Sequence, residues 1–380
     1  MRNFRLVLAC VLALAGVSAP TASPKRAKNV ILFLADAGGI PTLSAASLYG
    51  YGAPLKMHVQ GWPYLGLSDT SASDAFVTDS ANGMTAIVTG QKTHNAVISQ
   101  APDGVRGQTD GTLLKTVLEY AEERGLKTGV VTDQPITDAT PAACYAHSND
   151  RGKWGEIFPQ AFEPRFGDGV DILIGAGRIE IERQLVARGT SLGALAEKHQ
   201  RPIFSTLDQA ADTPRPVVVA ESIDVRRAAM RALDELQGSK TGYFLMVEWD
   251  AHTPDPKPGL DRLVAFDKLI AEVEKRVNLE DTLLLFTADH SFGLRVKGGG
   301  PGEPLLAGYD EWQAVAKRGE PVRLKNVLVD DTHTGEEVEV LAIGAGAEQV
   351  HGFFPNTRLF TVMMEAWGFP IDRAQGPAGK

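Results

Sequence analysis

The sequence predicts an α/β protein, a three-layer sandwich in which helices flank a mostly parallel central sheet. Residues 29–34 form an almost continuous apolar run, as expected of a parallel strand that is buried on both faces. Residues 111–125 place apolar side chains at helical spacing and end at a glycine, which predicts a helix. Residues 127–132 then return to a strand pattern. This strand–helix–strand order is typical of parallel sheets with helical crossovers.

The rest of the chain repeats the alternation. Residues 221–236 have the pattern of an amphipathic helix, and residues 242–248 that of a buried strand. The elements expected after them are a helix at 260–277, a strand at 282–287, a late strand at 337–343 and a closing helix at 359–367. Functional sites in such sheets lie beyond the carboxyl ends of the strands.

The N-terminus predicts a secretory signal peptide over residues 1–22. Arg2 and Arg5 provide a positive start, and residues 6–17 are apolar but too short to span a bilayer comfortably. A buried core strand or helix at the terminus is the alternative. With the signal interpretation, we expect a periplasmic or secreted protein without stable membrane insertion.

The remaining residues, 23–380, are expected to form a single catalytic domain. Residues 298–308 contain three consecutive glycines and two prolines, so we expect an insertion around 291–331. Cys10 would leave with the signal peptide, and Cys144 alone cannot form an internal disulfide. We therefore expect Cys144 to be a small buried apolar residue.

The net charge of −9 argues against a protein that binds a nucleic-acid backbone, because such a protein needs a basic face. Acidic side chains gathered locally serve a metal site better. We therefore expect no nucleic-acid partner.

The segment Thr78-Asp79-Ser80-Ala81 offers a candidate nucleophile where a loop turns into a helix. Backbone N–H groups at a helix start favour an anion, so a phosphate could lie over the Ser80 hydroxyl. Serine is a weak nucleophile at neutral pH and needs a base or a metal to activate it. A plain helix N-cap is the alternative interpretation.

Carboxylates and histidines suited to metal binding follow several expected strands. Four acidic residues lie at or just after strand ends, namely Asp36, Asp138, Glu248 and Asp289. Three histidines lie in acidic segments, namely His252 after Glu248 and Asp250, His290 after Asp289, and His333 after Asp331. Zinc favours imidazole and carboxylate ligands, and two zinc ions can clamp both oxygens of a displacement.

In these motifs the chain resembles the bacterial alkaline phosphatase family. Six separated segments match in order, and they are residues 34–39, 78–81, 138–143, 247–252, 287–290 and 333–338. The resemblance extends over almost the whole chain after the signal peptide. It implies an alkaline-phosphatase-like fold and a phosphomonoesterase that forms a phosphoserine intermediate with two Zn²⁺ and one Mg²⁺.

The resemblance also implies a role for each matching residue. Ser80 would be the nucleophile, and Arg151, eleven positions after Thr140, would bind the phosphate. Asp36, Asp289 and His290 would hold the second zinc, and Asp36 would also bridge to magnesium. The magnesium shell would add Asp138, Thr140 and Glu248, and the first zinc would be held by Asp250, His252 and His333.

One interval departs from the family pattern. The family places its first-zinc ligands further beyond the glutamate than Asp250 and His252 lie beyond Glu248. Residues that alternate by two share a face of a strand, so Asp250 and His252 could still act together. Asp255 is the reserve ligand if the turn has another shape.

Two groups of alternatives stay open. A phosphodiesterase, a nucleotide pyrophosphatase or a sulfatase of the same superfamily would share much of the metal framework. A non-catalytic periplasmic anion-binding protein is a more distant alternative, since it would need neither Ser80 nor the three histidine segments. The resemblance also allows a homodimer.

Overall fold

The computed structural model describes residues 26–317 and 319–371, so the expected signal peptide at 1–22 lies outside the described residues. Its main sheet has ten strands in the order β13-β2-β12-β8-β1-β7-β3-β4-β6-β5. The strands are β1 (Asn29–Asp36), β2 (Tyr64–Asp69), β3 (Lys127–Pro135), β4 (Ile172–Ala176), β5 (Ile203–Phe204), β6 (Val217–Val219), β7 (Tyr243–Asp250), β8 (Thr282–Thr287), β12 (Val338–Gly344) and β13 (Gly352–Pro355). Only β12 runs antiparallel to its neighbours in this sheet, so the predicted mostly parallel α/β fold is confirmed.

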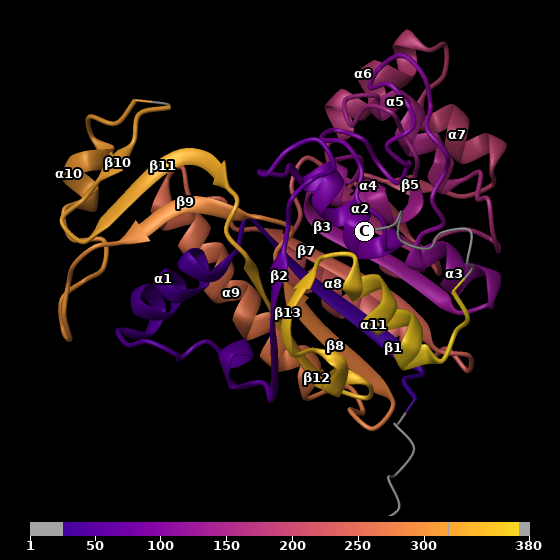
Figure 1. The fold of residues 1–380 in the computed structure, drawn as a ribbon. Coiled ribbons are helices and arrows are strands. Elements are labelled where there is room, and N and C mark those ends of the chain that lie inside the picture. The colour runs from indigo at the N-terminus through magenta and orange to yellow at the C-terminus, as the bar shows by residue number, and fades with distance from the viewer. Residues whose placement is uncertain (1–25, 318, 372–380) are drawn as a thin grey trace, which may run out of the picture.

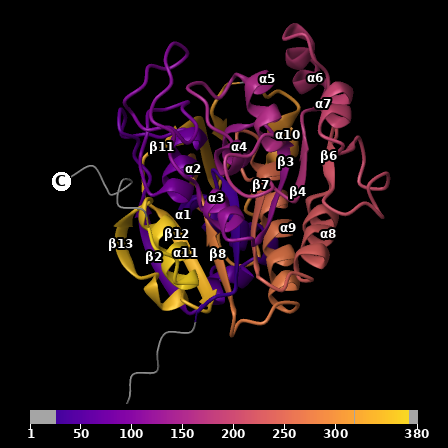
Figure 2. The same cartoon turned by 90° about the vertical axis from the view of Figure 1, so that its right-hand side faces the viewer.

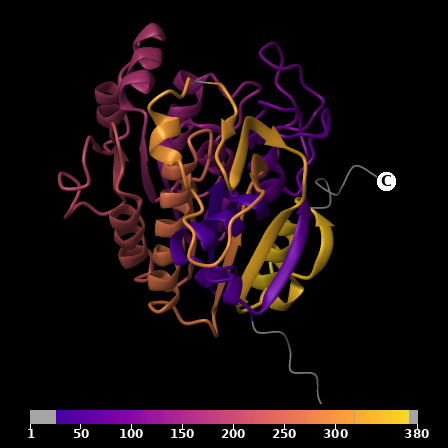
Figure 3. The ribbon, with the colours of Figure 1, turned by 90° about the vertical axis from the view of Figure 1, so that its left-hand side faces the viewer.

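Helices cover both faces of the sheet, and Figures 2 and 3 view the molecule from these two sides. One face carries α2 (Ser80–Thr89), α3 (Val117–Glu123), α4 (Ala139–Tyr145), α5 (Trp154–Ile157), α6 (Arg178–Ala187), α7 (Leu192–Lys198) and α11 (Arg358–Trp367). The other face carries α1 (Ile40–Tyr51), α8 (Val225–Leu236) and α9 (Pro256–Glu274). Short 3₁₀ helices lie at His58–Gly61, Phe158–Ala161 and Ala347–Gln349. No helix within the described residues has the length and apolar character that a bilayer crossing needs.

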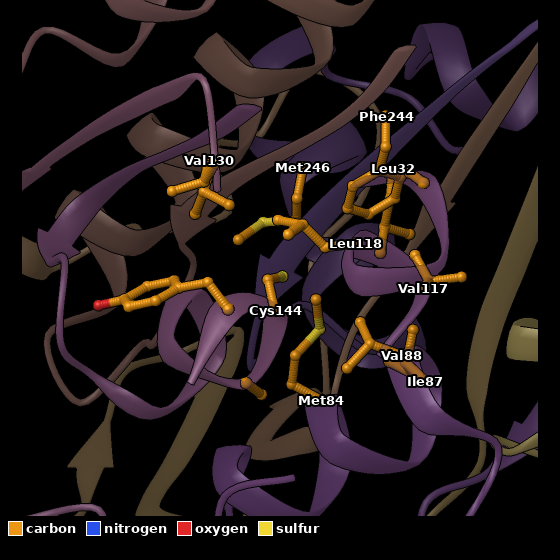
Figure 4. Close-up of a cluster of buried hydrophobic side chains, with 14 of the residues drawn as sticks. Leu32, Met84, Ile87, Val88, Val117, Leu118, Val130, Cys144, Phe244 and Met246 are labelled. Carbon is orange, nitrogen blue, oxygen red and sulfur yellow. The ribbon is translucent and has the colours of Figure 1, made fainter. Parts of the chain in front are cut away.

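Strand β1 shows how the sequence specifies two cores. Successive side chains of a strand point to opposite faces. Val30, Leu32 and Leu34 therefore pack in the core under α2, while Ile31 and Phe33 pack in the core under α9. Figure 4 shows the first of these cores, where Leu32 and the buried Cys144 lie among the labelled apolar side chains.

A second, three-stranded antiparallel sheet stands off the main body. It consists of β9 (Ser291–Val296), β10 (Val322–Arg323) and β11 (Val327–Thr334), and α10 (Tyr309–Gln313) lies in the connection before β10. Figure 3 shows this arm, defined as residues 291–334 where described, lying over α1. The arm takes up the region around 291–331 where an insertion was expected.

One helix begins later than predicted. Residues 111–125 were expected to be helical throughout, but α3 starts at Val117. Thr116 and Glu119 form a reciprocal capping box that starts the helix there. Before it, Leu113 forms an isolated antiparallel bridge with Gln100, and Leu114 donates its backbone N–H to the backbone oxygen of Ser99, so these residues are not helical.

Candidate functional site

The candidate site lies at the carboxyl ends of three adjacent central strands. Asp36 is the last residue of β1 and Asp250 the last of β7, and the two are paired in register. Asp289 and His290 follow β8 directly, on the other side of β1. The parallel order of β7, β1 and β8 therefore brings residues that are far apart in the sequence to one edge of the sheet.

Asp36, Ser80, Asp289 and His290 form the part of the site that we call the inner site. His290 Nε2 lies 3.3 Å from Ser80 Oγ, 3.4 Å from Asp36 Oδ1 and 3.5 Å from Asp289 Oδ2. Tetrahedral zinc with bonds of about 2.0–2.2 Å separates its ligand atoms by about 3.3–3.6 Å. The three distances from His290 Nε2 therefore match those between ligands of one zinc ion, and the ligand atoms of Asp36, Asp289 and His290 all lie within 4.8 Å of one another.

The inner site also contains buried polar atoms that lack hydrogen-bond partners. Asp36 Oδ1 and Asp289 Oδ2 are buried and have no hydrogen-bond partner. The other oxygen of Asp289 accepts from the backbone N–H groups of Ala37 and His290, which aims Oδ2 at the site. Ala37 adopts a left-handed backbone (φ 62°), a costly conformation for a residue with a side chain. Buried carboxylate oxygens without partners are costly, so this donor set fits a cation.

Electrostatics agree with that conclusion. Burial raises the pKa of Asp36 well above its usual range, and the nearby charges of Asp289, Asp250 and Asp138 add to the effect. Burial also lowers the pKa of His290 to about 4, so its imidazole is neutral at pH 7. A neutral imidazole next to crowded carboxylates is ready to bind a metal ion.

The nucleophile is placed by the start of α2. Ser80 is the first residue of this helix and is only 3% exposed. The N-cap residue Asp79 accepts from the backbone N–H of Asn82. A Cβ on Gly83 would lie 2.8 Å from the backbone oxygen of Asp289, so this glycine lets α2 approach the inner site closely.

Asp250, His252 and His333 form the neighbouring part of the site, the outer site. His252 Nε2 lies 3.3 Å from His333 Nε2, again the spacing of two ligands on one zinc ion. His333 comes from β11 of the arm, at a register shift that follows Asp330. The ring of Phe292 packs edge-on against His252, with 5.1 Å between the ring centroids.

Asp255, the reserve ligand, lies elsewhere. It is the N-cap of α9, and its two carboxylate oxygens accept from the Tyr309 hydroxyl at 2.8 and 3.0 Å. The turn after β7 therefore directs His252, and not Asp255, toward His333.

Glu248, Asp138 and Thr140, the residues expected around magnesium, lie beside the inner site on β7 and α4. Glu248 Oε2 accepts from Thr132 at 2.5 Å, while Glu248 Oε1 and Thr140 Oγ1 are buried without partners. Burial raises the pKa of Glu248 well above its usual range, and the charge of Asp36 adds to this. Asp138 is the N-cap residue of α4. The donors present therefore fit a second kind of cation that prefers oxygen ligands.

Arg151 reaches the site from the loop after α4. Its guanidinium donates to Asp79 Oδ2 and to Asp138 Oδ1, both at 3.0 Å. An arginine has five N–H donors, so these two bonds leave three for a ligand. Asp79 and Asp138 thus hold the planar group beside Ser80 and the inner site.

Three residues at the site were not predicted. Thr132 bonds Glu248, Phe292 packs on His252, and Arg262 bonds Asp250 Oδ2 at 2.5 Å. Thr132 closes the strand expected at 127–132, which is a usable signal, although β3 continues to Pro135. Arg262 and Phe292 have none, because their contacts arise only from the packing of α9 and of the arm.

Comparison with known proteins agrees with this geometry. The family model for alkaline phosphatase matches residues 27–184 and 220–318. Streptomycin-6-phosphate phosphatase of Streptomyces griseus is 29% identical, over 93% of this chain and 94% of its own. The human tissue-nonspecific alkaline phosphatase isozyme is 26% identical, over 86% of this chain and 81% of its own.

Solved structures show the same fold. The alkaline phosphatase of the Antarctic bacterium TAB5 superposes with a TM-score of 0.74 at 23% identity, covering 92% of this chain and all of that one. The Thermus thermophilus alkaline phosphatase has the same TM-score at 20% identity, covering 96% of this chain and 97% of its own. A variant of the TAB5 enzyme with magnesium in its M3 site is 25% identical, with a TM-score of 0.72 and coverage of 92% and 100%.

Proposed function

The chain belongs to the alkaline phosphatase family and is a phosphatase, and we propose that it hydrolyses phosphate monoesters through a phosphoserine at Ser80. The observation that carries the proposal is the inner site. Ser80 Oγ lies 3.3 Å from His290 Nε2, beside two buried carboxylate oxygens that have no partner. A hydroxyl in this setting is a nucleophile next to a cation site, which a plain helix N-cap does not require.

We propose that two zinc ions and one magnesium ion serve the reaction. Asp36, Asp289 and His290 would hold one zinc, and Asp250, His252 and His333 the other. Magnesium would be held by oxygens of Asp36, Asp138, Thr140 and Glu248. When bound, the ions lower the pKa of the Ser80 hydroxyl, stabilise the departing alkoxide and activate water. The magnesium found in the TAB5 variant is consistent with metal cofactors in this fold.

The side chains of the site have separate roles in the phosphoryl transfer. Arg151 binds two oxygens of the phosphoryl group with its remaining N–H donors and neutralises the charge that resides there. Ser80 Oγ attacks phosphorus, so that a Ser80–phosphate bond forms as the bond to the alcohol breaks. Water then attacks the same phosphorus from the side the alcohol left. This second step breaks the Ser80–phosphate bond and releases inorganic phosphate.

We further propose a periplasmic or secreted location, small phosphate-ester substrates and the option of a homodimer. The location rests on the signal-peptide pattern of residues 1–22, and the substrate size on the shared family. Mass spectrometry of the protein purified from the periplasm or medium tests the location, because removal of the leader shortens the chain at its N-terminus.

Competing turnover of p-nitrophenyl phosphate and bis-p-nitrophenyl phosphate tests the reaction. We expect kcat/KM to favour the monoester, because Arg151 and the cation sites suit the extra charged oxygen. Preference for the diester would favour the phosphodiesterase alternative, and turnover of a sulfate ester in its place would favour a sulfatase.

Elemental analysis of the same preparation tests the metals. We expect stoichiometric zinc, loss of activity on chelation, restoration by zinc and a smaller gain from magnesium. A protein without zinc that binds phosphate but turns nothing over would be an anion-binding protein.

A further inference from the structure

A cavity of about 430 Å³ lies at the edge of the main sheet opposite the candidate site. Asp168, Arg201 and Arg215 line it, and they come four, two and two residues before β4, β5 and β6. These strands run parallel to β3 and β7. The cavity therefore lies at the amino ends of the strands, whereas the inner and outer sites lie at carboxyl ends. Its volume is in the range of sites for small molecules.

The lining of the cavity combines charged and apolar side chains. Arg201, Arg215, His199 and the acid Asp168 lie beside the aromatic ring of Phe162. We propose that the cavity binds a small organic carboxylate, whose charged group pairs with Arg201 and whose apolar part lies against Phe162. This site is separate from the phosphatase site, and the inference does not depend on the proposed function.

Arg201 is a partly buried arginine whose hydrogen bonds all go to backbone oxygens. Nη2 donates to the backbone oxygens of Asp171 at 2.6 Å and of Arg215 at 3.2 Å, and Nε donates to that of Arg215 at 3.3 Å. Burial and the neighbouring charge of Arg215 lower the pKa of Arg201 to about 10, and more distant acidic side chains only partly offset this. Within the part of the chain that the structure describes, Arg201 forms no ion pair.

This leaves Arg201 with a charge and two donors to offer. A guanidinium has five N–H donors, and the three bonds to backbone oxygens use those of Nε and Nη2. Both N–H groups of Nη1 therefore remain for a ligand. A charge that is withdrawn from water is stabilised by an ion partner with good hydrogen-bond geometry, which a carboxylate provides.

The other charged groups around the cavity are paired with one another. Arg215 Nη1 donates to Asp168 Oδ2 at 2.8 Å, and Arg215 Nε lies 3.0 Å from Asp171 Oδ1. Asp171 also accepts from Lys127 at 2.7 Å. The charge that lacks a direct partner is thus that of Arg201, and one negative charge balances it. A carboxylate carries one charge, whereas a phosphate ester would bring nearly two next to Asp168.

His199 and Phe162 form the wall beside Arg201. The ring centroids of His199 and Phe162 lie 5.5 Å apart, and the guanidinium carbon of Arg201 lies 5.8 Å from the Phe162 centroid. His199 Nε2 is buried without a hydrogen-bond partner, since Glu163 Oε1 is 3.7 Å away and is bonded to Lys198. A carboxylate with an apolar body would give Arg201 an ion partner, His199 a hydrogen-bond partner and Phe162 a surface to pack on.

Calorimetric titration of the full-length, metal-loaded protein with benzoate tests the proposal. Benzoate carries one negative charge on an apolar ring, and benzyl alcohol has the ring without the charge. We expect one benzoate to bind per chain and benzyl alcohol to bind far more weakly. Arg201→Gln should weaken benzoate binding by about 10–100-fold, because it removes hydrogen bonds between charged groups. A wild type that binds no benzoate, or binds both compounds equally, would overturn the proposal.

Two control variants locate the bound benzoate. Arg151→Ala alters the candidate site, so a loss in this variant in place of Arg201→Gln would put benzoate there and contradict us. Arg178→Gln is the matched control, because Arg178 also donates to backbone oxygens, those of Phe204 and Val219, but does not line the cavity. It should leave benzoate binding unchanged. An equal loss in Arg178→Gln would attribute the effect to lost backbone contacts and count against the cavity.

A second variant keeps the test decisive if Arg201→Gln does not fold. Thr213→Trp fills the cavity and keeps both arginines, so it should abolish benzoate binding and leave the turnover of p-nitrophenyl phosphate unchanged. Benzoate affinity equal to that of wild type would overturn the proposal. Tighter binding of phenylphosphonate that depends on Arg201 would overturn the assignment to a carboxylate. A wild type that binds benzoate but hydrolyses no monoester would contradict only the proposed function.

Discussion

The inner and outer sites use the same kinds of side chain but hold them differently. Asp289 and His290 of the inner site have no exposed surface, while the His252 side chain of the outer site is 26% exposed. Asp36 Oδ1 and Asp289 Oδ2 of the inner site lack hydrogen-bond partners, whereas both oxygens of Asp250 in the outer site have them. The buried carboxylates of the inner site are therefore destabilising until a cation binds. In the outer site, hydrogen bonds already offset much of the cost of burying the carboxylate.

The difference follows from which elements supply the donors. Asp36 and Asp289 come from the ends of β1 and β8, neighbouring central strands with cores on both faces. The outer site joins the end of β7 to His333 on the arm. Rigid central strands can hold unsatisfied groups in place, because the surrounding packing resists their rearrangement. A site shared with a separate sheet needs internal hydrogen bonds to keep its shape.

The largest effect expected from one substitution concerns the inner site. Ser80→Ala should lower the turnover of p-nitrophenyl phosphate by roughly 10³-fold or more, because no other hydroxyl takes the place of the nucleophile. Phosphate binding should persist, since Arg151 and the cation sites remain. Steady-state kinetics and phosphate inhibition measure the two properties, with exposed Ser73→Ala as the control. Turnover near that of wild type would remove Ser80 from the mechanism.

The difference between the two sites can be tested directly by substituting one expected zinc ligand in each and comparing zinc binding. Asp289→Asn should weaken zinc binding by more than about 100-fold, because it removes a buried charged ligand. His333→Gln should leave zinc binding at the inner site intact, which we expect to be the tighter of two binding steps. It should abolish only the weaker step, at the outer site. Calorimetric zinc titrations of both variants provide the measurement. A His333 variant that loses the tighter ion would reverse our ranking of the sites.

Arg151 tests substrate binding separately from metal binding. Arg151→Ala removes charge-assisted hydrogen bonds to the phosphoryl group. A single bond of this kind is worth about 1.5–3 kcal/mol, so kcat/KM should fall by at least roughly 10–100-fold. Arg151→Lys should recover only part of the loss, since it keeps the charge without the planar fork. Zinc stoichiometry should not change in either variant. Arg106→Ala, which removes an exposed arginine paired with Asp150, serves as the kinetic control.

The smallest effect concerns a buried carboxyl away from the site, that of Glu339 on β12, both of whose oxygens lack hydrogen-bond partners. Burial raises its pKa from 4.5 to about 8. Between those values the folded state holds a proton that the unfolded chain has lost, so the free energy of unfolding falls as the pH rises and levels off above about pH 8. Glu339→Gln should make the free energy of unfolding fall less steeply with pH. Glu337→Gln, at an exposed position, is the control and should leave the slope unchanged.

Urea unfolding of the metal-free protein at several pH values between 5 and 9 measures the effect. Identical slopes for Glu339→Gln and wild type would mean that this carboxyl finds a partner in solution. The comparison also distinguishes a buried carboxyl that no metal ion serves from Asp36 and Asp289, whose pH dependence should change when zinc is added.

Much of the fold could be predicted because its central strands are long apolar runs. The bounds of β8 agree with the predicted strand at both ends, and β1 begins at the predicted residue and runs two residues further, to Asp36. The start of α3 could not be placed from periodicity, because the capping box at Thr116 overrides the apolar spacing before it. The strands of the arm were not foreseen, since β10 has only two residues and glycines interrupt the region.

The site also contains residues that could be predicted from the sequence and residues that could not. Asp36, Asp289 and His290 meet as expected, because strand ends place them. Arg262 could not be found from the sequence, because it lies ten positions after His252 with no motif between them, and only the packing of α9 brings it to Asp250.

His333 lies five residues before Val338, where the chain re-enters the main sheet as β12, and its ring is hydrogen-bonded to the backbone oxygen of Thr78, two residues before Ser80. Both connections are short. Deleting or adding a single residue between 333 and 338, or between 78 and 80, should therefore misplace the ring relative to the nucleophile. The glycine-rich stretch at 298–302 is exposed, has no such role and should accept a longer peptide, which makes it the natural place to graft a tag or a fluorescent reporter onto a working enzyme.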